Sequence, residues 1–251
     1  MEVIVITGGS RGIGAAAAAA AARACADRGL GVILTYNSHP EAAEAVVMQI
    51  RQSGGRAVAL PLDVADTASF PLFREAVTRA LEENWPGASL RGLVNNAGYG
   101  VYNPIETVTK EQFDDLFSVH LKGPFFLMQA LLPLIREGGA IVNLTSATTR
   151  VATAGVAPYA SFKGGLEVLT RYMAKEFGPR RIRANAVSPG AIRTELGGGL
   201  TDEFEALLAS QTALGRVGEA EEVGRVIASL FTNELGWVNG QSIEVGGGYC
   251  I

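Results

Sequence analysis

The chain has 251 residues, of which 48% are hydrophobic and 31 are glycines, which predicts a sizeable core with many tight turns. Its formal net charge of −4 argues against nucleic acid as a partner, because phosphate binding requires a basic face. The two cysteines, Cys25 and Cys250, lie far apart, so we expect neither a disulfide framework nor a metal site, and a reducing cytoplasm as the setting.

Short β-rich runs alternate with helical patterns along the whole chain. Strands are expected over 2–7, 31–36, 56–61, 90–95, 139–145, 182–188 and 241–245, and helices over 12–28, 40–53, 66–84, 109–135, 158–178 and 219–231. This alternation predicts right-handed βαβ units and an α/β fold with a doubly wound parallel sheet of about seven strands and helices on both faces. With no linker or repeat, residues 1–251 are expected to form a single domain.

Local composition refines three of these elements. The alanine tract 15–22 is too short and too weakly apolar to cross a membrane, and it predicts a helix that packs closely on the sheet. Gly29 is expected to end this helix, and the pair Gly123 and Pro124 to bend the helix over 109–135. No targeting segment is expected, since Met1 leads almost directly into an apolar strand.

A glycine-rich stretch separates the first predicted strand from the first helix. Gly8, Gly12 and Gly14 follow the spacing Gly-x3-Gly-x-Gly, at the place where a dinucleotide fold needs a tight turn and close approach to a pyrophosphate. The N–H groups at the start of the helix would then face the anion. The alternative is a glycine-rich turn that binds no ligand.

The end of the second strand bears on the choice of cofactor. A carboxylate there would bind the ribose 2′-hydroxyl of NAD and repel a 2′-phosphate. Residues 34–38 contain no acid, Asn37 and Ser38 add donors, and Arg11 in the glycine loop could meet the phosphate. These features favour NADP over NAD.

Tyr159 and Lys163 stand four residues apart at the start of a predicted helix, so both side chains lie on one face. A free phenol titrates at about pH 10. A neighbouring cation lowers that pKa and makes the tyrosine a usable general acid and base. The alternative is an exposed helical pair without function.

The glycine loop and this pair belong to a longer series of motifs in order along the chain: Thr7-Gly8-x3-Gly12-x-Gly14, Asp63-Val64, Asn95-Asn96-Ala97-Gly98, Ser146, Tyr159-x3-Lys163 and Pro189-Gly190. Together they resemble the short-chain dehydrogenase/reductase family, in its ordinary-length NAD(P)-dependent branch. The resemblance covers essentially the whole chain and implies a Rossmann-type fold. Segments 239–241 and 245–248 look like those of carbonyl reductases and 3-oxoacyl reductases.

The resemblance also implies roles for single residues. Tyr159 would exchange a proton with the substrate oxygen, and Ser146 would orient the carbonyl. Lys163 would bind the nicotinamide ribose and, with the cationic oxidised ring, depress the pKa of the phenol. Cofactor contacts are implied or expected at Gly8, Ser10, Arg11, Gly12, Ile13, Gly14, Tyr36, Asn37, Ser38, Asp63, Val64, Asn95, Ala97, Gly98, Tyr159, Lys163, Pro189, Gly190, Ile192 and Thr194. Taken locally, Ser146 could instead be a strand-end cap and Asp63 a turn former.

One position departs from the family pattern. His120 stands where the family usually has an asparagine that holds a water linking the lysine to solvent. Histidine also donates and accepts hydrogen bonds, and it titrates near neutrality. We therefore expect His120 to retain the proton relay with an altered pH response. The alternative is a structural histidine in a bent helix.

The predicted reaction is hydride transfer between NADP(H) and a medium-sized, mostly apolar ketone or secondary alcohol, with reduction favoured. Pocket walls are expected from 99–103, 147–157 and 190–212, with Val101, Tyr102, Val151, Ile192 and Leu196 contributing and Arg150 facing water. The glycine-marked segment 190–218 predicts a mobile lid, or otherwise a solvated loop.

Three other functions stay open. A 3-oxoacyl thioester reductase would need basic residues near the mouth of the pocket, whereas Lys175, Arg180, Arg181 and Arg183 lie further along the chain. An NAD-dependent secondary-alcohol dehydrogenase would need the missing acid. An NADP-sensing protein without catalysis would have lost part of the Ser146, Tyr159 and Lys163 set.

The apolar run 125–135 and a second set, Phe162, Leu166, Leu169 and Met173, predict a buried helical face. Core packing accounts for much of it. The resemblance implies that the remainder forms subunit contacts, commonly in a homotetramer.

Overall fold

The computed structural model describes residues 2–24 and 30–251 and places a seven-stranded sheet at the centre of the molecule. Its strand order is β3-β2-β1-β4-β5-β6-β9, and every neighbouring pair is parallel. The strands are β1 Glu2–Ile6, β2 Gly31–Tyr36, β3 Arg56–Pro61, β4 Ser89–Asn95, β5 Ile135–Leu144, β6 Arg183–Pro189 and β9 Ser242–Val245. The predicted doubly wound α/β fold is confirmed.

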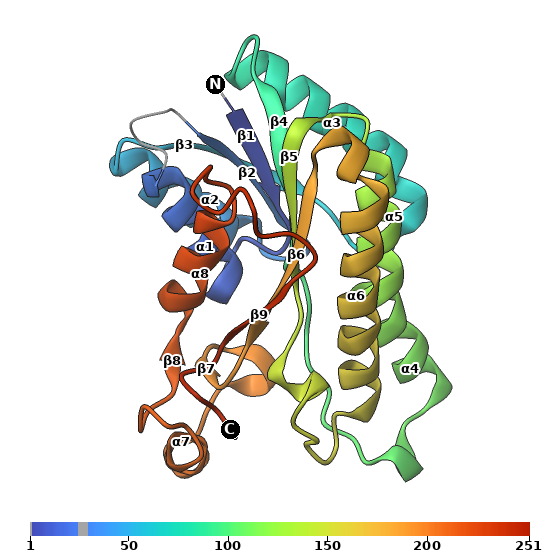
Figure 1. Ribbon diagram of the computed structural model, residues 1–251, viewed down its shortest axis with the longest axis vertical. Helices are drawn as coiled ribbons and strands as arrows, with labels where there is room; N and C mark the ends of the chain where they lie inside the picture. Colours follow the sequence, from blue (N-terminus) through green and yellow to red (C-terminus); the bar gives the residue numbers. More distant parts are fainter. Residues whose placement is uncertain (1, 25–29) are drawn as a thin grey trace.

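Helices cover both faces of this sheet (Figure 1). On one side lie α1 Gly12–Ala24, α2 Pro40–Gln52 and α8 Ala220–Ser229, and on the other α3 Phe70–Asn84, α5 Gly123–Leu131 and α6 Ala157–Glu176. Each side buries its own apolar cluster against the strands, which explains why β1, β2 and β4 are apolar on both faces. Within the described ranges, we find no helix long and apolar enough to cross a membrane.

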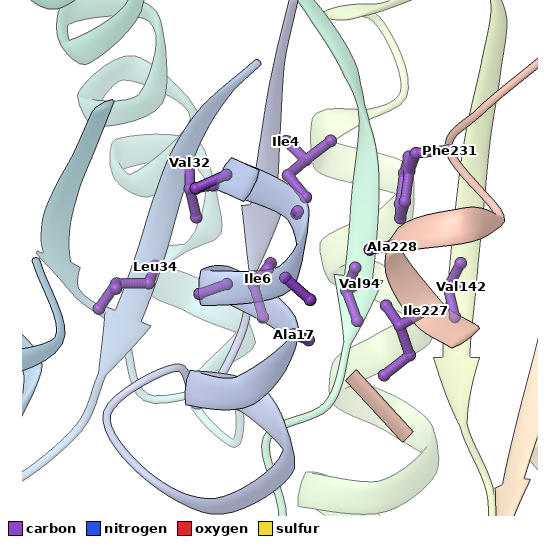
Figure 2. Close-up of a cluster of buried hydrophobic side chains, with 14 of the residues drawn as sticks. Ile4, Ile6, Ala17, Val32, Leu34, Val94, Val142, Ile227, Ala228 and Phe231 are labelled. Atoms are coloured by element: carbon purple, nitrogen blue, oxygen red, sulfur yellow. The ribbon is translucent and has the colours of Figure 1, made fainter. Parts of the chain in front are cut away.

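The alanine-rich helix α1 packs closely, as predicted. Ala17 is fully buried between the sheet and α8, beside Ile227 (Figure 2). A Cβ atom at Gly224 of α8 would lie 2.7 Å from the carbonyl carbon of Ala16, so neither helix has room for larger side chains at this crossing. The expected cap at Gly29, like Cys25, lies outside the described residues.

The helix predicted over 109–135 is instead three elements. Helix α4, Lys110–Phe117, passes into a π-helical turn, Ser118–Lys122, before α5 begins. Pro124 explains the widened turn, because its ring lacks an N–H and would clash with the carbonyl of residue 120 in an α-helix. The helix ends at Leu131 because β5 already begins at Ile135, four residues before its predicted start.

The segment 190–218 contains regular structure that the sequence did not predict. Strands β7, Ile192–Arg193, and β8, Gly218–Glu219, pair in parallel, and helix α7, Asp202–Ser210, lies between them. The guanidinium of Arg193 bonds both carboxylate oxygens of Glu205 and, at 3.2 Å, Glu219. This segment, named the lid below after its predicted role, therefore contains folded secondary structure.

The apolar face predicted on two helices divides into a buried part and an exposed part. Phe162, Leu166 and Met173 of α6 are buried in the chain's own core. Phe125 and Phe126 of α5, by contrast, are 39% and 40% exposed. The exposed phenylalanines, and not these three buried residues of α6, are available for contacts with another subunit.

Candidate active site

A cavity of about 640 Å³ opens at the carboxyl ends of the central strands. Its lining residues follow six strands of the sheet, namely Gly8, Asn37, Leu62, Asn96, Thr145 and Gly190 after β1, β2, β3, β4, β5 and β6. Strand order reverses between β1 and β4, which is where open parallel sheets bind their ligands.

Nearly all of the predicted site residues line this one cavity. They are Gly8, Ser10, Arg11, Gly12, Ile13, Gly14, Tyr36, Asn37, Ser38, Asp63, Val64, Ala97, Gly98, His120, Ser146, Tyr159, Lys163, Pro189, Gly190, Ile192 and Thr194. His39 also lines it and was missed, although it directly follows Ser38 in the same loop.

The glycine loop is shaped by contacts that exclude side chains. Gly8 and Gly12 have φ angles of +64° and +54°, in the left-handed region that favours glycine. A Cβ atom at Gly14 would lie 2.2 Å from the carbonyl oxygen of Gly8 and 2.4 Å from Nδ2 of Asn96. The backbone of this loop can therefore approach a ligand, and its conformation depends on glycine at position 14.

Asn96 holds the glycine loop from the opposite side. Its Nδ2 donates to the carbonyl oxygens of Thr7 at 2.8 Å and Gly8 at 3.0 Å, and its own N–H donates to Oγ1 of Thr7 at 3.0 Å. These bonds join the turn after β1 to the turn after β4, across the cavity floor. Sequence reasoning gave Asn96 no separate role.

Of the two roles expected of Asn95, at the cofactor ribose and in stabilising the central sheet, the structure shows the second. Asn95 is buried inside the sheet, where its Nδ2 donates at 2.8 Å to Oδ1 of Asn143, its register partner on β5. Asn143 in turn donates to Thr170 at 2.8 Å. Neighbouring strand residues point to opposite faces, so only one of the two asparagines could reach the cavity.

Lys163 is the most deeply buried charged group of the site. Its side chain is 5% exposed, and Nζ donates to the carbonyl oxygen of Leu144 at 2.6 Å. Burial lowers the pKa of Lys163 to about 8. Nζ lies 5.6 Å from the centroid of the Tyr159 ring, so the two residues do share one face of α6.

Tyr159 does not titrate in the predicted direction. Burial raises the pKa of the phenol above its ordinary value, while a hydrogen bond with Ser146 acts the other way. Lys163 does not reverse this, because its ammonium group bonds the Leu144 carbonyl and not the phenol. Tyr159 is therefore a protonated phenol at neutral pH, which suits a proton donor better than a base.

Ser146 has the capping role that the sequence offered as one alternative. Its Oγ caps the following turn by accepting from the N–H of Thr148 at 3.2 Å, and it also accepts from the Thr148 hydroxyl at 3.0 Å. A hydroxyl has two acceptor sites and one O–H. With both acceptor sites engaged, the proton of Ser146 is directed outward as a donor beside Tyr159.

His120 is neutral, so the expectation that it titrates near neutrality is wrong. Its ring is 1% exposed, and burial, with the neighbouring charge of Lys163, lowers its pKa to about 3. Nε2 lies 2.8 Å from the carbonyl oxygen of Tyr99, which can only accept, so Nε2 carries the proton. Among residues 2–24 and 30–251, Nδ1 has no hydrogen-bond partner, and its lone pair is buried in the wall of the cavity.

The imidazole ring of His120 also packs closely against two neighbouring residues of the site. Its ring packs edge-on against Tyr159, with centroids 4.9 Å apart. A Cβ atom at Gly98 would lie 2.7 Å from Cε1 of the ring, so a glycine at position 98 makes room for it.

Two charged residues at the cavity have partners within the chain. Nη1 of Arg11 lies 3.5 Å from Oε2 of Glu195, which joins the glycine loop to the lid through two exposed side chains. Asp63 lines the cavity and also accepts from the N–H of Ala65 at 2.9 Å, so the turn-forming role foreseen for it is present.

Fewer of the residues expected in the walls of the pocket line the cavity than predicted. Tyr99, Ile192 and Leu196 line the cavity, whereas Val101, Tyr102 and Val151 do not. The ring of Tyr102 lies over Gly155, where a Cβ atom would be 2.7 Å from it, and is thus held away from the cavity. Arg150 does not simply face water, because it bonds Glu244 and two backbone carbonyls.

No group of three or more histidine, cysteine, aspartate or glutamate side chains in the described part of the chain could hold a metal ion. The arrangement consists of a glycine-walled cradle for an anion beside a serine hydroxyl, a protonated phenol and a buried ammonium group. That set can donate a proton to an oxygen atom while a second group bound on the glycine side reacts with the adjoining carbon.

Comparison with known proteins agrees with this geometry. The family model described as Enoyl-(Acyl carrier protein) reductase matches residues 8–250. An uncharacterized oxidoreductase of Methylorubrum extorquens is 37% identical over 250 residues, 98% of this chain and 97% of that protein. A 3-oxoacyl-(acyl-carrier-protein) reductase of Staphylococcus aureus is 34% identical over 97% of this chain and 96% of its own.

Among solved structures, the angucycline C-6 ketoreductase LanV with bound NADP superimposes with a TM-score of 0.93. It is 32% identical and covers 99% of this chain and 95% of its own. Sequence and structure thus lead to one result over nearly the whole length: the chain is an oxidoreductase of the short-chain dehydrogenase/reductase family.

Proposed function

We propose that the protein reduces a medium-sized, mostly apolar ketone to a secondary alcohol with NADPH. The observation that carries this proposal is the protonated phenol of Tyr159, hydrogen-bonded with Ser146 at the cavity wall beside the buried Lys163. When bound, the nicotinamide supplies a hydride to the carbonyl carbon. The glycine cradle fits its pyrophosphate, since positions 8 and 14 exclude any side chain.

The chain's own groups perform the remaining chemistry. Ser146 donates a hydrogen bond to the carbonyl oxygen and orients it. Tyr159 gives its phenolic proton to that oxygen as the C=O bond becomes a C–OH bond, and the ammonium group of Lys163 stabilises the phenolate that remains. Each group holds or moves one proton, and the alcohol leaves as the neutral product.

NADP is the proposed form of the cofactor. Tyr36, Asn37, Ser38 and His39 line the cavity after β2, and this stretch contains no carboxylate to repel a 2′-phosphate. Arg11 lies on the same rim and is 65% exposed, so its guanidinium is available to an incoming phosphate. The resemblance to LanV, which was solved with NADP bound, supports the same choice.

The variant Arg11→Ala tests the cofactor assignment. We expect it to weaken NADPH binding by about tenfold, because a charge-assisted hydrogen bond contributes about 1.5–3 kcal/mol. Binding of NADH, which has no 2′-phosphate, should stay unchanged. Fluorescence titration gives both dissociation constants, with the exposed Arg74→Ala as a matched control. Equal losses for the two cofactors would contradict the role of Arg11.

His120 is proposed to serve the proton relay as a neutral hydrogen-bond acceptor. Its Nδ1, which has no hydrogen-bond partner in the described part of the chain, lies in the wall of the cavity, and the ring is close to Tyr159 and Lys163. As a neutral acceptor, Nδ1 would bond a proton donor of the relay without any change in the charge of the imidazole. This differs from a relay in which the histidine itself takes up the proton.

Substitution of His120 distinguishes these relays. We expect His120→Leu to lower kcat by about tenfold through loss of one acceptor, and His120→Asn to lower it much less. Because the pKa of His120 is about 3, NMR should detect no titration of its ring between pH 5 and 8. The chain has only two histidines, so His39→Asn assigns the signals. A ring titrating near pH 6.5 would support the proton-carrying alternative.

An acyl-carrier-protein substrate is less well supported. Lys175, Arg180, Arg181 and Arg183 lie toward the edge of the sheet where β5 and β6 begin, whereas the cavity lies where those strands end. Arg180 and Arg181 are also engaged with Ile135 and Glu137. The acidic side chains of Glu195 and Glu205 are on the lid instead, which gives an acidic partner little to bind.

The function is tested by following NADPH oxidation with aryl ketones, diketones, β-keto esters and 3-oxoacyl thioesters. We expect turnover of the aryl ketones, because the similarity to an angucycline ketoreductase favours such substrates. Turnover of the thioesters alone would favour the relationship to the 3-oxoacyl reductases. NADPH binding without turnover of any carbonyl would favour a sensing protein.

A homotetramer is also proposed, with the exposed Phe125 and Phe126 of α5 in a subunit contact. Large exposed aromatic side chains side by side are characteristic of protein interfaces. A mass equal to one subunit in gel filtration would contradict this.

A further inference from the structure

The segment that follows β9 lies directly behind the cavity wall. We call residues 246–250 the strap. A Cβ atom at Gly190, which lines the cavity, would lie 2.7 Å from Cα of Gly246 and 3.2 Å from Cβ of Tyr249. The N–H of Gly190 donates to the carbonyl oxygen of Val245 at 3.1 Å. The strap is thus packed on the turn after β6 with no space between them.

The strap is also bonded to the end of the lid. The N–H of Cys250 donates to the carbonyl oxygen of Gln211 at 2.9 Å, and Ala213 donates back to Gly248 at 3.1 Å. Thr212 and Tyr249 form an antiparallel bridge between these bonds. In Figure 1 the end of the chain accordingly lies beside β7 and α7. The residues directly after α7 are therefore held by the strap.

Arg150 connects this assembly to the catalytic serine. It stands four residues after Ser146, at the end of the turn that Ser146 caps, and its N–H donates to Ala147 at 3.0 Å. Nη1 donates to the carbonyl oxygen of Cys250 at 2.8 Å, and Nη2 to that of Tyr249 at 2.8 Å and to the carboxylate of Glu244. One planar guanidinium thus joins the C-terminal end of the strap, at Tyr249 and Cys250, to Glu244 of β9, which precedes the strap.

We infer that Arg150 is a positioning residue that fixes the lid relative to Ser146 by clamping the strap between them. This inference rests on the proposed function, because its effect is exerted on the carbonyl substrate. The bonds of Arg150 point to the strap, so it is not an anion-binding group of the pocket. A lysine cannot replace it, since a single ammonium group does not match the forked geometry of the three acceptors.

The clamp predicts a defect that affects the ketone substrate more than the cofactor. In Arg150→Met, KM for the ketone should rise by about tenfold, since displaced contacts remote from the chemistry reduce productive binding. The dissociation constant of NADPH should rise less than KM, because the pyrophosphate cradle at Gly8 and Gly14 is held by Asn96 and not by Arg150. Arg150→Lys should behave like Arg150→Met, and Glu244→Gln, which spares the two carbonyl acceptors, should show a smaller effect. Arg181→Met, which removes a surface pair with Glu137, is the matched control.

A second measurement does not depend on activity. Chymotrypsin should cut the lid at Leu196, Phe204 or Leu207 faster in Arg150→Met than in the unchanged protein, with Arg181→Met unaffected. Unaltered KM and unaltered proteolysis would overturn the inference. A rise in KM restricted to anionic ketones would also overturn it, because Arg150 would then bind substrate directly. If the unchanged protein reduces no ketone, the proposed function fails, while proteolysis still decides whether the clamp holds the lid.

Discussion

Tyr159→Phe should lower kcat by about a thousandfold while leaving NADPH binding intact, because a positioned general acid contributes about 10²–10⁴ in rate. The substitution removes a single oxygen atom and retains the ring that packs against His120. Single-turnover oxidation of NADPH with a reactive ketone measures the chemical step. Fluorescence titration measures cofactor binding independently.

A matched control stands on the same helix. Tyr172 of α6 is 62% exposed and far from the cavity lining, so Tyr172→Phe should leave both quantities unchanged. In the unchanged protein, reduction should weaken as pH rises past about 8, where Lys163 begins to lose its proton and can no longer stabilise the phenolate. Full activity of Tyr159→Phe would refute the assignment of the proton donor.

Gly14→Ala is expected to weaken NADPH binding by about ten- to a hundredfold. Its added methyl group would fall 2.2 Å from the carbonyl oxygen of Gly8 and 2.4 Å from Asn96, both of them part of the cradle. Overpacking of this kind typically costs about 1–3 kcal/mol. If the loop must shift by that free energy to bind the cofactor, affinity falls tenfold for each 1.4 kcal/mol or so. Isothermal titration with NADPH measures the loss.

Gly164→Ala controls for the loss of a glycine as such. Gly164 lies on α6, and a Cβ atom there meets no atom within 4 Å, so cofactor affinity should not change. Thermal unfolding should show both variants folded. Normal NADPH affinity in Gly14→Ala would mean that the loop can shift to accommodate the methyl group and that the cradle is not rigid.

The parts of the site that the sequence predicted correctly depend on local backbone geometry. The tight turn between β1 and α1 needs positive φ angles at Gly8 and Gly12, and glycine adopts such angles most easily. The glycines of this turn could therefore be identified from the sequence alone. The shared face of Tyr159 and Lys163 follows from helical periodicity alone. The order of strands and helices likewise reflects local apolar patterns, so the sheet was predicted with small errors at its ends.

The errors arise where segments distant in sequence meet. Which of Asn95 and Asn96 faces the cavity depends on the pairing of β4 with β5. The raised pKa of Tyr159 and the lowered pKa of His120 follow from burial by several elements. The bonds of Arg150 reach across about a hundred residues of chain, which no local pattern could indicate.

Burial of Lys163 has a consequence for the thermodynamics of folding. Its pKa is about 8 in the folded chain against 10.5 for the free side chain, so the unfolded chain binds the proton more tightly. This difference opposes folding by about 3 kcal/mol below pH 8, and the penalty disappears as pH rises through 10.5. His120 adds a penalty of the same sign below pH 6.5. Other interactions in the fold must therefore offset the free-energy cost of burying these two groups.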